Sequence, residues 1–297
     1  MTNNIEMINY YIDTHLDSEF ERIQKYSYID LKLCPSEHSC KNEWLSLSNT
    51  DKKWTYSNII KRFHQNIAYA NRTNSLCPYD GWETIKKDKT LFEKLLRNRL
   101  TYNKSLTRHG MPSELPLHIY AQGMMVMRMY PEVSYFKPSL AKYLINKYLN
   151  DSKFIIDPFS GYSGRMLGVL ASGKKYCGSD LCQMSVVESQ EIYDWLINNF
   201  DDIPEAYIEE SDAENTHTSD FDALFTCPPY EDIESWPDVH SDIHNCDEWI
   251  DICISNNKCK KYLFVVDDKI DKWKSNIVET IENCSHFGKN IEYVVLV

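Results

Sequence analysis

Two short segments of this 297-residue chain carry residue types that are suited to chemistry. The segment 157–165, with the sequence DPFSGYSGR, contains Gly161 and Gly164, which permit a sharp turn and the close approach of a nucleotide-like ligand. The segment 227–230, Cys-Pro-Pro-Tyr, follows a short apolar run and ends in an aromatic residue. Its two prolines fix the directions of backbone carbonyls, and its tyrosine offers a ring face. Together the segments indicate a cofactor turn beside a pocket for a planar group.

The hydrophobic pattern after residue 138 alternates between expected strands and expected helices. Strands are expected at 154–156, 176–178, 207–208, 223–226, 262–266 and 291–297, and helices at 139–149, 164–172, 186–199 and 275–283. This alternation predicts an α/β fold with a mostly parallel sheet, which binds ligands at the carboxyl ends of its strands. Asp157, Asp180, Asp212 and Cys227 each follow a strand, so we expect them along one edge.

The first 130 residues have a different pattern, in which helical spacing dominates. Helices are expected over 5–30, 58–70, 84–100 and 119–129. The chain is therefore predicted to contain a mainly helical module at 1–130 and an α/β domain at 131–297.

Three motifs in order carry a family resemblance: the Phe136-Lys137-Pro138 start of a helix, the glycine turn after Asp157, and the Cys-Pro-Pro-Tyr segment. Over residues 134–297 the chain resembles the S-adenosylmethionine-dependent amino-methyltransferases of DNA, which methylate N6 of adenine or N4 of cytosine. It is similar to the methylases that phages and mobile elements carry. The resemblance implies a Rossmann-like methyltransferase domain, with recognition of the target by residues 1–130.

The resemblance also implies that S-adenosylmethionine is the cofactor. The residues implied to hold it are Phe136, Lys137, Asp157, Pro158, Phe159, Gly161, Gly164, Asp180 and Asp212. Asp180 lies nineteen residues beyond Gly161, an offset at which a strand-end acid can reach ribose hydroxyls. Asp212 resembles the acid that contacts the adenine of the donor. Asp157 has two interpretations, as a residue that fixes the turn or as a contact of the methionyl ammonium group.

Methylation of an exocyclic amine requires that the nitrogen lone pair be aimed at the sulfonium methyl group. The Pro228 carbonyl can accept an amino proton, Pro229 stiffens the backbone, and Tyr230 can stack on the base. Since the reacting nitrogen is inaccessible inside a duplex, the base must be flipped out or single-stranded. The resemblance thus makes Cys227, Pro228, Pro229 and Tyr230 the catalytic segment.

Cys227 departs from the family pattern, which places Asp, Asn or Ser at this position. A thiol is a weak hydrogen-bond acceptor. Either the Pro228 carbonyl takes a larger part, or Thr226 or Asp232 assists, or catalysis is slow. Covalent attack by the thiolate is disfavoured, because carbon-5 cytosine methylases place their cysteine after the proline. Both N4 of cytosine and N6 of adenine stay open as targets.

Charge divides the chain unevenly. Residues 1–150 have a net charge of +6 and residues 151–297 one of −18, within a total of −12. DNA, the expected partner, should therefore be held mainly by the first half. Candidate contacts are Arg97, Arg99, Lys104 and Arg108, whose alternative role is a solvated helix face. Trp236 could line the base pocket or anchor its own loop.

Other classes of site find little support in the sequence. Ten cysteines without a signal peptide favour reduced thiols and a cytoplasmic location, and no apolar run reaches the roughly 18 residues that span a membrane. Cys34, His38, Cys40 and Cys77 have zinc-binding types, but they lack the two tight pairs of a structural site, so no metal is expected.

Two further functions remain open beside methylation of DNA. A methyltransferase of this kind could act on RNA or on another planar amine, and a catalytically weak member could bind DNA or a partner subunit. The resemblance also leaves room for a cognate restriction nuclease as a partner.

Overall fold

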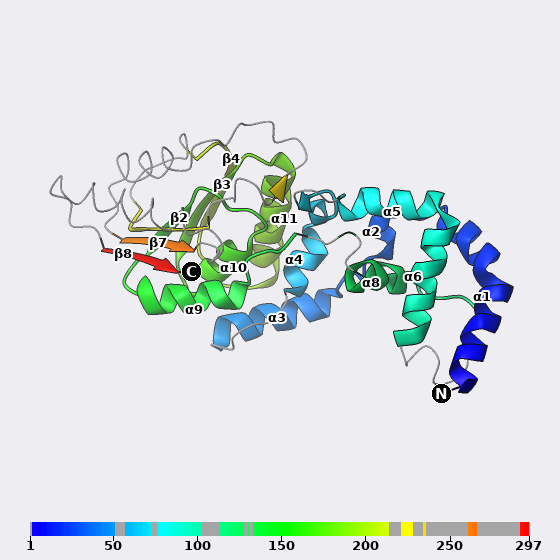
Figure 1. The fold of residues 1–297 in the computed structure, drawn as a ribbon. Coiled ribbons are helices and arrows are strands. Elements are labelled where there is room, and N and C mark those ends of the chain that lie inside the picture. The colour runs from blue at the N-terminus through cyan, green and yellow to red at the C-terminus, as the bar shows by residue number, and fades with distance from the viewer. Residues whose placement is uncertain are drawn as a thin grey trace. The chain divides into compact units, whose positions relative to one another are not determined.

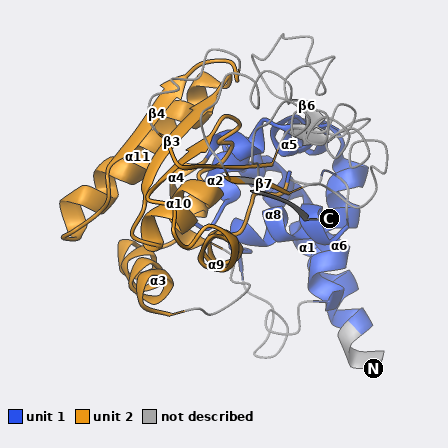
Figure 2. Cartoon of the chain, turned by 90° about the vertical axis from the view of Figure 1, so that its left-hand side faces the viewer, with its two compact units in different colours: residues 1–34, 65–133, 233–237 blue, residues 35–64, 134–232, 238–297 orange. Residues whose placement is uncertain are grey.

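The computed structural model describes residues 2–50, 57–72, 76–102, 113–127, 130, 133–213, 221–227, 234–235, 261–265 and 292–296. These residues fall into two compact units (Figure 2). Unit 1 comprises residues 1–34, 65–133 and 233–237, and unit 2 comprises 35–64, 134–232 and 238–297. Among the described helices, none has the length and apolar character that a membrane span requires.

Unit 1 is helical. Its described elements are α1 (Thr2–Ile23), α2 (Tyr28–Leu31), the short 3₁₀ helix η1 (Asn66–Ala68), β1 (Asn71–Arg72), α5 (Pro78–Lys87), α6 (Lys89–Tyr102), α8 (His118–Val126) and β6 (Glu234–Ser235). Apolar faces of these helices form one core, in which Trp82, Phe92 and Tyr120 are fully buried. Within that core the Glu19 carboxylate accepts hydrogen bonds from the Tyr120 hydroxyl at 2.8 Å and the Leu115 amide at 3.0 Å.

Unit 2 is built on a six-stranded sheet whose pairings are all parallel. Its strands are β2 (Phe154–Asp157), β3 (Lys175–Asp180), β4 (Ala206–Glu210), β5 (Ala223–Thr226), β7 (Lys261–Val265) and β8 (Glu292–Leu296). Their order across the sheet is β4-β3-β2-β5-β7-β8 (Figure 1). All six strands expected from the hydrophobic pattern are confirmed, and with them the Rossmann-like α/β architecture.

Among the described residues of unit 2, the helices are α3 (Glu37–Asn49), α4 (Asn58–Phe63), α9 (Pro138–Tyr148), α10 (Gly164–Ala171) and α11 (Gln183–Asn199). The helix α10 packs against α9 and β3, and α11 packs against β3 and β4. The close approach of α10 to α9 requires Gly168, because a Cβ atom there would lie 2.4 Å from that of Ala141. The expected helix at 275–283 lies outside the described residues.

The segment 35–64 groups with the sheet, whereas the expected domain boundary places it in the helical module. The buried Lys142 of α9 donates to the carbonyls of Leu47 at 2.7 Å and Ser48 at 3.0 Å, near the carboxyl end of α3. The ring of Trp44 on α3 contacts that of Phe200, with centroids 6.1 Å apart. These contacts cross large sequence separations, which is why composition and periodicity place the segment with its sequence neighbours instead.

The single helix predicted over 5–30 is wrong, because α1 ends at Ile23 and a second helix begins at Tyr28. Ser27 and Asp30 form a capping box: the Ser27 amide donates to the Asp30 carboxylate at 2.7 Å, and the Asp30 amide donates to the Ser27 hydroxyl. A capping box of this kind begins a new helix.

We predict that Lys142→Met lowers the free energy of unfolding by about 1.5 to 3 kcal/mol, the usual cost of removing hydrogen bonds from a charged donor. The lysine satisfies carbonyls that no helical amide reaches, and methionine keeps the length of the side chain without the donor. Urea denaturation measures the change, and Lys147→Met on the exposed side of α9 is the matched control. Equal midpoints for the two variants would contradict the capping role.

Candidate functional site

The strand order reverses between β2 and β5. From β2 the chain adds β3 and β4 on one side, and it then returns to place β5 and β7 on the other. Asp157, Asp180 and Cys227 end or directly follow β2, β3 and β5, and Asp212 follows β4 by two residues. Since these strands are parallel neighbours, the four residues lie along one edge, as the sequence predicts. Open α/β sheets bind their ligands at such a reversal.

Asp157 is the centre of this edge. Its carboxylate is fully buried and accepts hydrogen bonds from Nε of Arg165 at 2.7 Å, the Thr226 hydroxyl at 2.8 Å and the Tyr176 hydroxyl at 3.1 Å. The Phe159 amide donates to it as well, at 3.4 Å. One carboxylate therefore joins β2, β3, β5 and α10. Of its two interpretations, the structure favours the one in which Asp157 fixes the turn, because its acceptor positions are occupied.

Arg165 supplies the counter-charge to Asp157. Burial lowers the pKa of its guanidinium, but the charge of Asp157 and its hydrogen bond raise that pKa, and the net direction is upward. The same guanidinium donates to the Phe159 carbonyl and lies over the ring of Phe136, 5.4 Å from its centroid. Arg165 thus stays charged and holds both the turn and the segment before α9. Cys227 lies within electrostatic reach of this cation.

Gly161 and Asp180, predicted to act together, are in contact. The Gly161 amide donates to one oxygen of the Asp180 carboxylate at 2.8 Å, and the Cys182 amide donates to the other at 2.9 Å. Gly161 has a φ of +56°, and a Cβ atom there would find no neighbour closer than 3.9 Å. Burial raises the pKa of Asp180, and its two backbone hydrogen bonds oppose that rise. The turn is therefore open beside Gly161 and anchored beneath by Asp180.

Gly164 has a different surrounding from Gly161. A Cβ atom at Gly164 would lie 1.8 Å from the carbonyl oxygen of Phe136, so the backbone before α9 occupies that space. The glycine turn thus has open space beside Gly161, whereas its own chain fills the space beside Gly164.

The end of β5 leads into the Cys-Pro-Pro-Tyr segment. Thr226 is fully buried and donates its hydroxyl proton to Asp157, so this hydroxyl ties the end of β5 to β2. Cys227 is half-buried, and its thiol forms no disulfide bond within the described part of the chain. Outside the described residues lie Pro228, Pro229, Tyr230, Asp232 and Trp236.

The other predicted cofactor residues lie before α9, within the glycine turn and after β4. Phe136 contacts Phe225 of β5 edge to face, with ring centroids 5.7 Å apart, and Lys137 is the residue before α9. The Pro158 carbonyl accepts the Ser179 hydroxyl at 3.4 Å. The Ser211 hydroxyl donates to the Asp212 carbonyl at 3.1 Å, just beyond β4.

Two of the candidate DNA contacts, Arg97 and Arg99, lie in unit 1, on α6. Arg97 is half-buried and pairs with Glu93 at 2.7 Å and with Asn9 at 2.9 Å. Arg99 is only 7% exposed and lies against Gly123 of α8, and burial lowers its pKa. The structure therefore assigns Arg99 to the core and not to a surface that a phosphate can approach. Lys104 and Arg108 lie outside the described residues.

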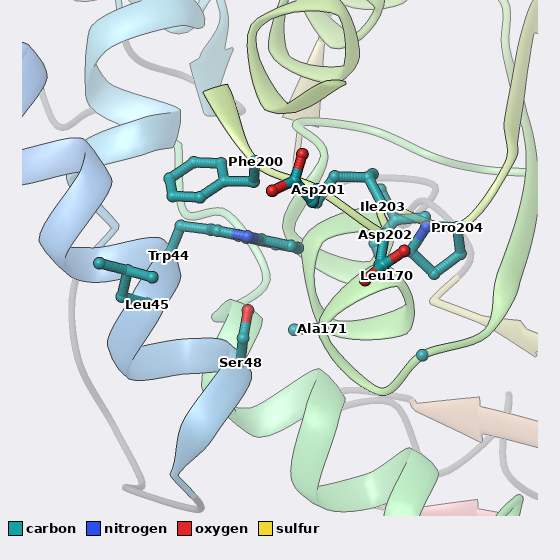
Figure 3. A pocket seen from close by; sticks show the side chains of 11 residues that line it. Trp44, Leu45, Ser48, Leu170, Ala171, Phe200, Asp201, Asp202, Ile203 and Pro204 are labelled. Atoms are coloured by element: carbon teal, nitrogen blue, oxygen red, sulfur yellow. The ribbon is translucent and has the colours of Figure 1, made fainter. Parts of the chain in front are cut away.

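A hollow of about 370 Å³ lies at the other end of the sheet strands (Figure 3). It is bordered by Trp44 of α3, the end of α10 and the loop from Phe200 to Pro204 that leads into β4. Because these segments precede strands, the hollow is at the amino edge of the sheet, away from Asp157 and Cys227. Two exposed acids, Asp201 and Asp202, border it.

No protein-family model and no curated protein sequence matches the chain. Among solved structures it is similar to the magnesium protoporphyrin IX methyltransferase of Synechocystis PCC 6803 with bound SAM, at 11% sequence identity and a TM-score of 0.30. The match covers 54% of this chain and 68% of that chain. A likeness this low carries no inference about activity, so the architecture rests on the strand order of the sheet itself. In the described part of the chain, no three His, Cys, Asp or Glu side chains converge as metal ligands do.

Several residues of this edge were not singled out from the sequence: Ser163, Arg165, Tyr176, Glu188 and His64. Arg165 had a signal, because it is the one charged residue in the otherwise apolar helix α10, and a buried charge requires a partner. His64 had none, since it lies 99 residues before the serine that it contacts.

We predict that Asp157→Asn lowers the free energy of unfolding by about 3 to 5 kcal/mol, because it leaves the buried Arg165 cation without its counter-charge. Asp151→Asn is the control, since that side chain is 84% exposed and pairs only at 3.5 Å with Lys261. Denaturant unfolding followed by circular dichroism measures both. A loss at Asp157 no greater than that at Asp151 would show that the buried pair does not hold the sheet edge.

Proposed function

We propose that the chain is an S-adenosylmethionine-dependent methyltransferase that acts on the exocyclic amine of cytosine or adenine in DNA. The observation that carries the proposal is the meeting of two segments at the strand reversal. The glycine turn after β2 is joined through Asp157 to Thr226, the residue before the Cys-Pro-Pro-Tyr segment. A donor site and an acceptor segment are thereby held together by one carboxylate.

In this proposal the donor lies across the open side of Gly161. Each oxygen of Asp180 accepts one backbone amide and keeps a lone pair that can receive a ribose hydroxyl. Asp212, after the neighbouring strand β4, is assigned to the adenine of the donor, and Phe159 to contact with the cofactor. Phe136 and Lys137, placed before α9, flank the methionine part of the donor.

The acceptor base, flipped from its stack, meets the donor at residues 227–230. The Pro228 carbonyl accepts an amino proton, so that the nitrogen lone pair turns toward the sulfonium methyl group. The nitrogen then forms a bond to the methyl carbon while the sulfur–methyl bond breaks, and S-adenosylhomocysteine and a proton leave. Tyr230 stacks on the base. Cys227 adds a half-buried, weak acceptor beside the Arg165 cation.

Unit 1 is assigned to recognition of the target DNA. The positive half of the sequence contains its helices, and the negative half contains most of the sheet unit. Thr226 and Glu234 are separated by eight positions, so the chain leads directly from the acceptor segment into β6, which pairs with β1 of unit 1. Arg97 remains a candidate phosphate contact.

A second candidate function is supported by Cys227, the departure from the family pattern: a weak enzyme of this fold that binds DNA or a partner subunit. Incubation with labelled donor and either duplex DNA or RNA, each followed by digestion to nucleosides, separates the candidates. Label in N4-methylcytosine or N6-methyladenine supports the first. Label in RNA alone would show that the substrate is RNA and not DNA. Donor binding without transfer supports the second candidate function.

We predict that Asp180→Asn weakens the binding of S-adenosylmethionine by about 10- to 100-fold, as expected for the loss of hydrogen bonds to a charged acceptor. Asparagine keeps the shape but offers only one acceptor oxygen to the donor and the two amides. Isothermal titration calorimetry measures the dissociation constant. The control is Asp201→Asn at the amino edge of the sheet, and a similar loss in both variants would remove Asp180 from the donor site.

We predict that Tyr230→Ala abolishes methyl transfer while it leaves donor affinity unchanged, because the tyrosine is assigned to the base alone.

In contrast, Cys227→Ala should keep transfer within about tenfold of the wild type, since a thiol contributes a weak acceptor and direct displacement needs no nucleophile from the protein. Transfer from labelled donor and calorimetry of the donor measure the two steps. Complete loss of transfer in Cys227→Ala would point to a covalent mechanism.

A further inference from the structure

His64 links Glu188 to Ser163 of the glycine turn in a hydrogen-bonded trio. Nδ1 of His64 lies 3.0 Å from Oε2 of Glu188, and Nε2 lies 2.7 Å from the Ser163 hydroxyl. The Ser163 hydroxyl in turn lies 2.6 Å from that of Ser189 on α11. With a neutral imidazole, each donor in this series of hydrogen bonds has one acceptor. His64 donates to Glu188, Ser163 donates to His64, and Ser189 donates to Ser163.

The trio has the acid–histidine–serine arrangement of hydrogen bonds found in serine hydrolases. Its serine, however, is not accessible to a substrate. Ser163 is 1% exposed and His64 is fully buried. The ring of Tyr162 packs edge-on against the imidazole, with centroids 5.5 Å apart. A nucleophile must reach its substrate, so the arrangement is suited to holding the backbone and not to attacking a ligand.

The conformation of Ser163 shows what is being held. It lies at φ 60° and ψ 5°, in the left-handed region, directly before α10. A serine at this position ordinarily has extended backbone angles and caps the helix with its hydroxyl. Here the hydroxyl makes no capping bond and points to His64 instead. Left-handed geometry is unfavourable for a residue with a Cβ atom, so it persists only where other contacts enforce it.

The histidine comes from the segment 35–64, and its own position is well determined. His64 directly follows α4, and its amide donates to the Ile60 carbonyl at 2.8 Å. The start of α4 is held by Glu43 of α3, whose carboxylate accepts the amides of Asn58 at 2.5 Å and Ile59 at 3.1 Å. The α3–α4 segment is thus a brace that brings one imidazole to the turn.

We propose that His64 is a positioning residue for the donor site: with Glu188, it fixes Ser163 in the left-handed conformation and so sets the shape of the turn from Gly161 to Gly164. This inference rests on the proposed function, since it assigns the turn to S-adenosylmethionine. It makes residues 35–64 part of the donor site and not of DNA recognition.

The test uses the preference of glycine for left-handed geometry. Ser163→Ala removes the hydroxyl but keeps the Cβ atom, and it should weaken donor binding about 5- to 30-fold, the ratio that corresponds to the usual left-handed penalty. Ser163→Gly removes both and should bind the donor as the wild type does, because glycine needs no enforcement. Calorimetry with S-adenosylmethionine measures the affinities of the full-length protein.

The double variant separates positioning from general stability. As a single substitution, His64→Phe should weaken donor binding. In the Ser163→Gly background it should leave donor binding unchanged, whereas a merely structural role of His64 would weaken binding equally in both backgrounds. The control is His38→Phe, a change at an exposed histidine of the same segment. Hydrogen exchange of the peptide 158–166, measured without donor, should accelerate in His64→Phe and Ser163→Ala only.

Each outcome has a distinct meaning. Equal losses of affinity in Ser163→Ala and Ser163→Gly would overturn the inference, as would unchanged exchange of the turn peptide in His64→Phe. If His64→Phe does not fold, the two serine variants decide the matter by themselves. Failure of the wild-type protein to bind S-adenosylmethionine would overturn the proposed function, while the exchange measurement would still show whether His64 holds the turn.

Discussion

The buried ion pair of Asp157 and Arg165 is the interaction on which the candidate site depends. A carboxylate with no exposed surface is stable only where donors replace its water, and here a guanidinium, two hydroxyls and a backbone amide do so. These donors come from β3, β5, α10 and the turn itself. The buried charge of Asp157 would be unfavourable without these donors. Because it requires them, it determines where the glycine turn and the end of β5 meet.

The position of the segment 35–64 changes which residues are assigned to each part of the proposed function. It lies within the helical first part of the sequence, but it packs on the sheet unit, where Lys142 caps α3 and His64 reaches the glycine turn. The helical residues thus have two roles. Unit 1 is proposed to recognise the target, and the α3–α4 segment is proposed to brace the donor site. Residues 35–64 should therefore be considered apart from the rest of residues 1–130 when a function is assigned to that module.

Local patterns predicted the elements of the sheet unit well and those of unit 1 less well. All six strands were found, and a buried strand such as β5 appears as a short apolar run between helices. The helix expected at 84–100 is instead two helices, since Asp88 accepts the amides of Thr90 at 2.9 Å and Leu91 at 3.0 Å and so begins α6. Capping side chains divide helices that hydrophobic spacing alone joins.

The sequence by itself determined the α/β class, the glycine turn and the placement of four polar residues after strands, because these follow from periodicity and from the backbone freedom of glycine. Only the tertiary structure decided what each polar residue contacts. It assigned Asp157 to Arg165, Arg99 to the core and His64 to Ser163. The reason is physical: a hydrogen bond depends on positions in space, and residues separated by 99 places leave no periodic trace in the chain.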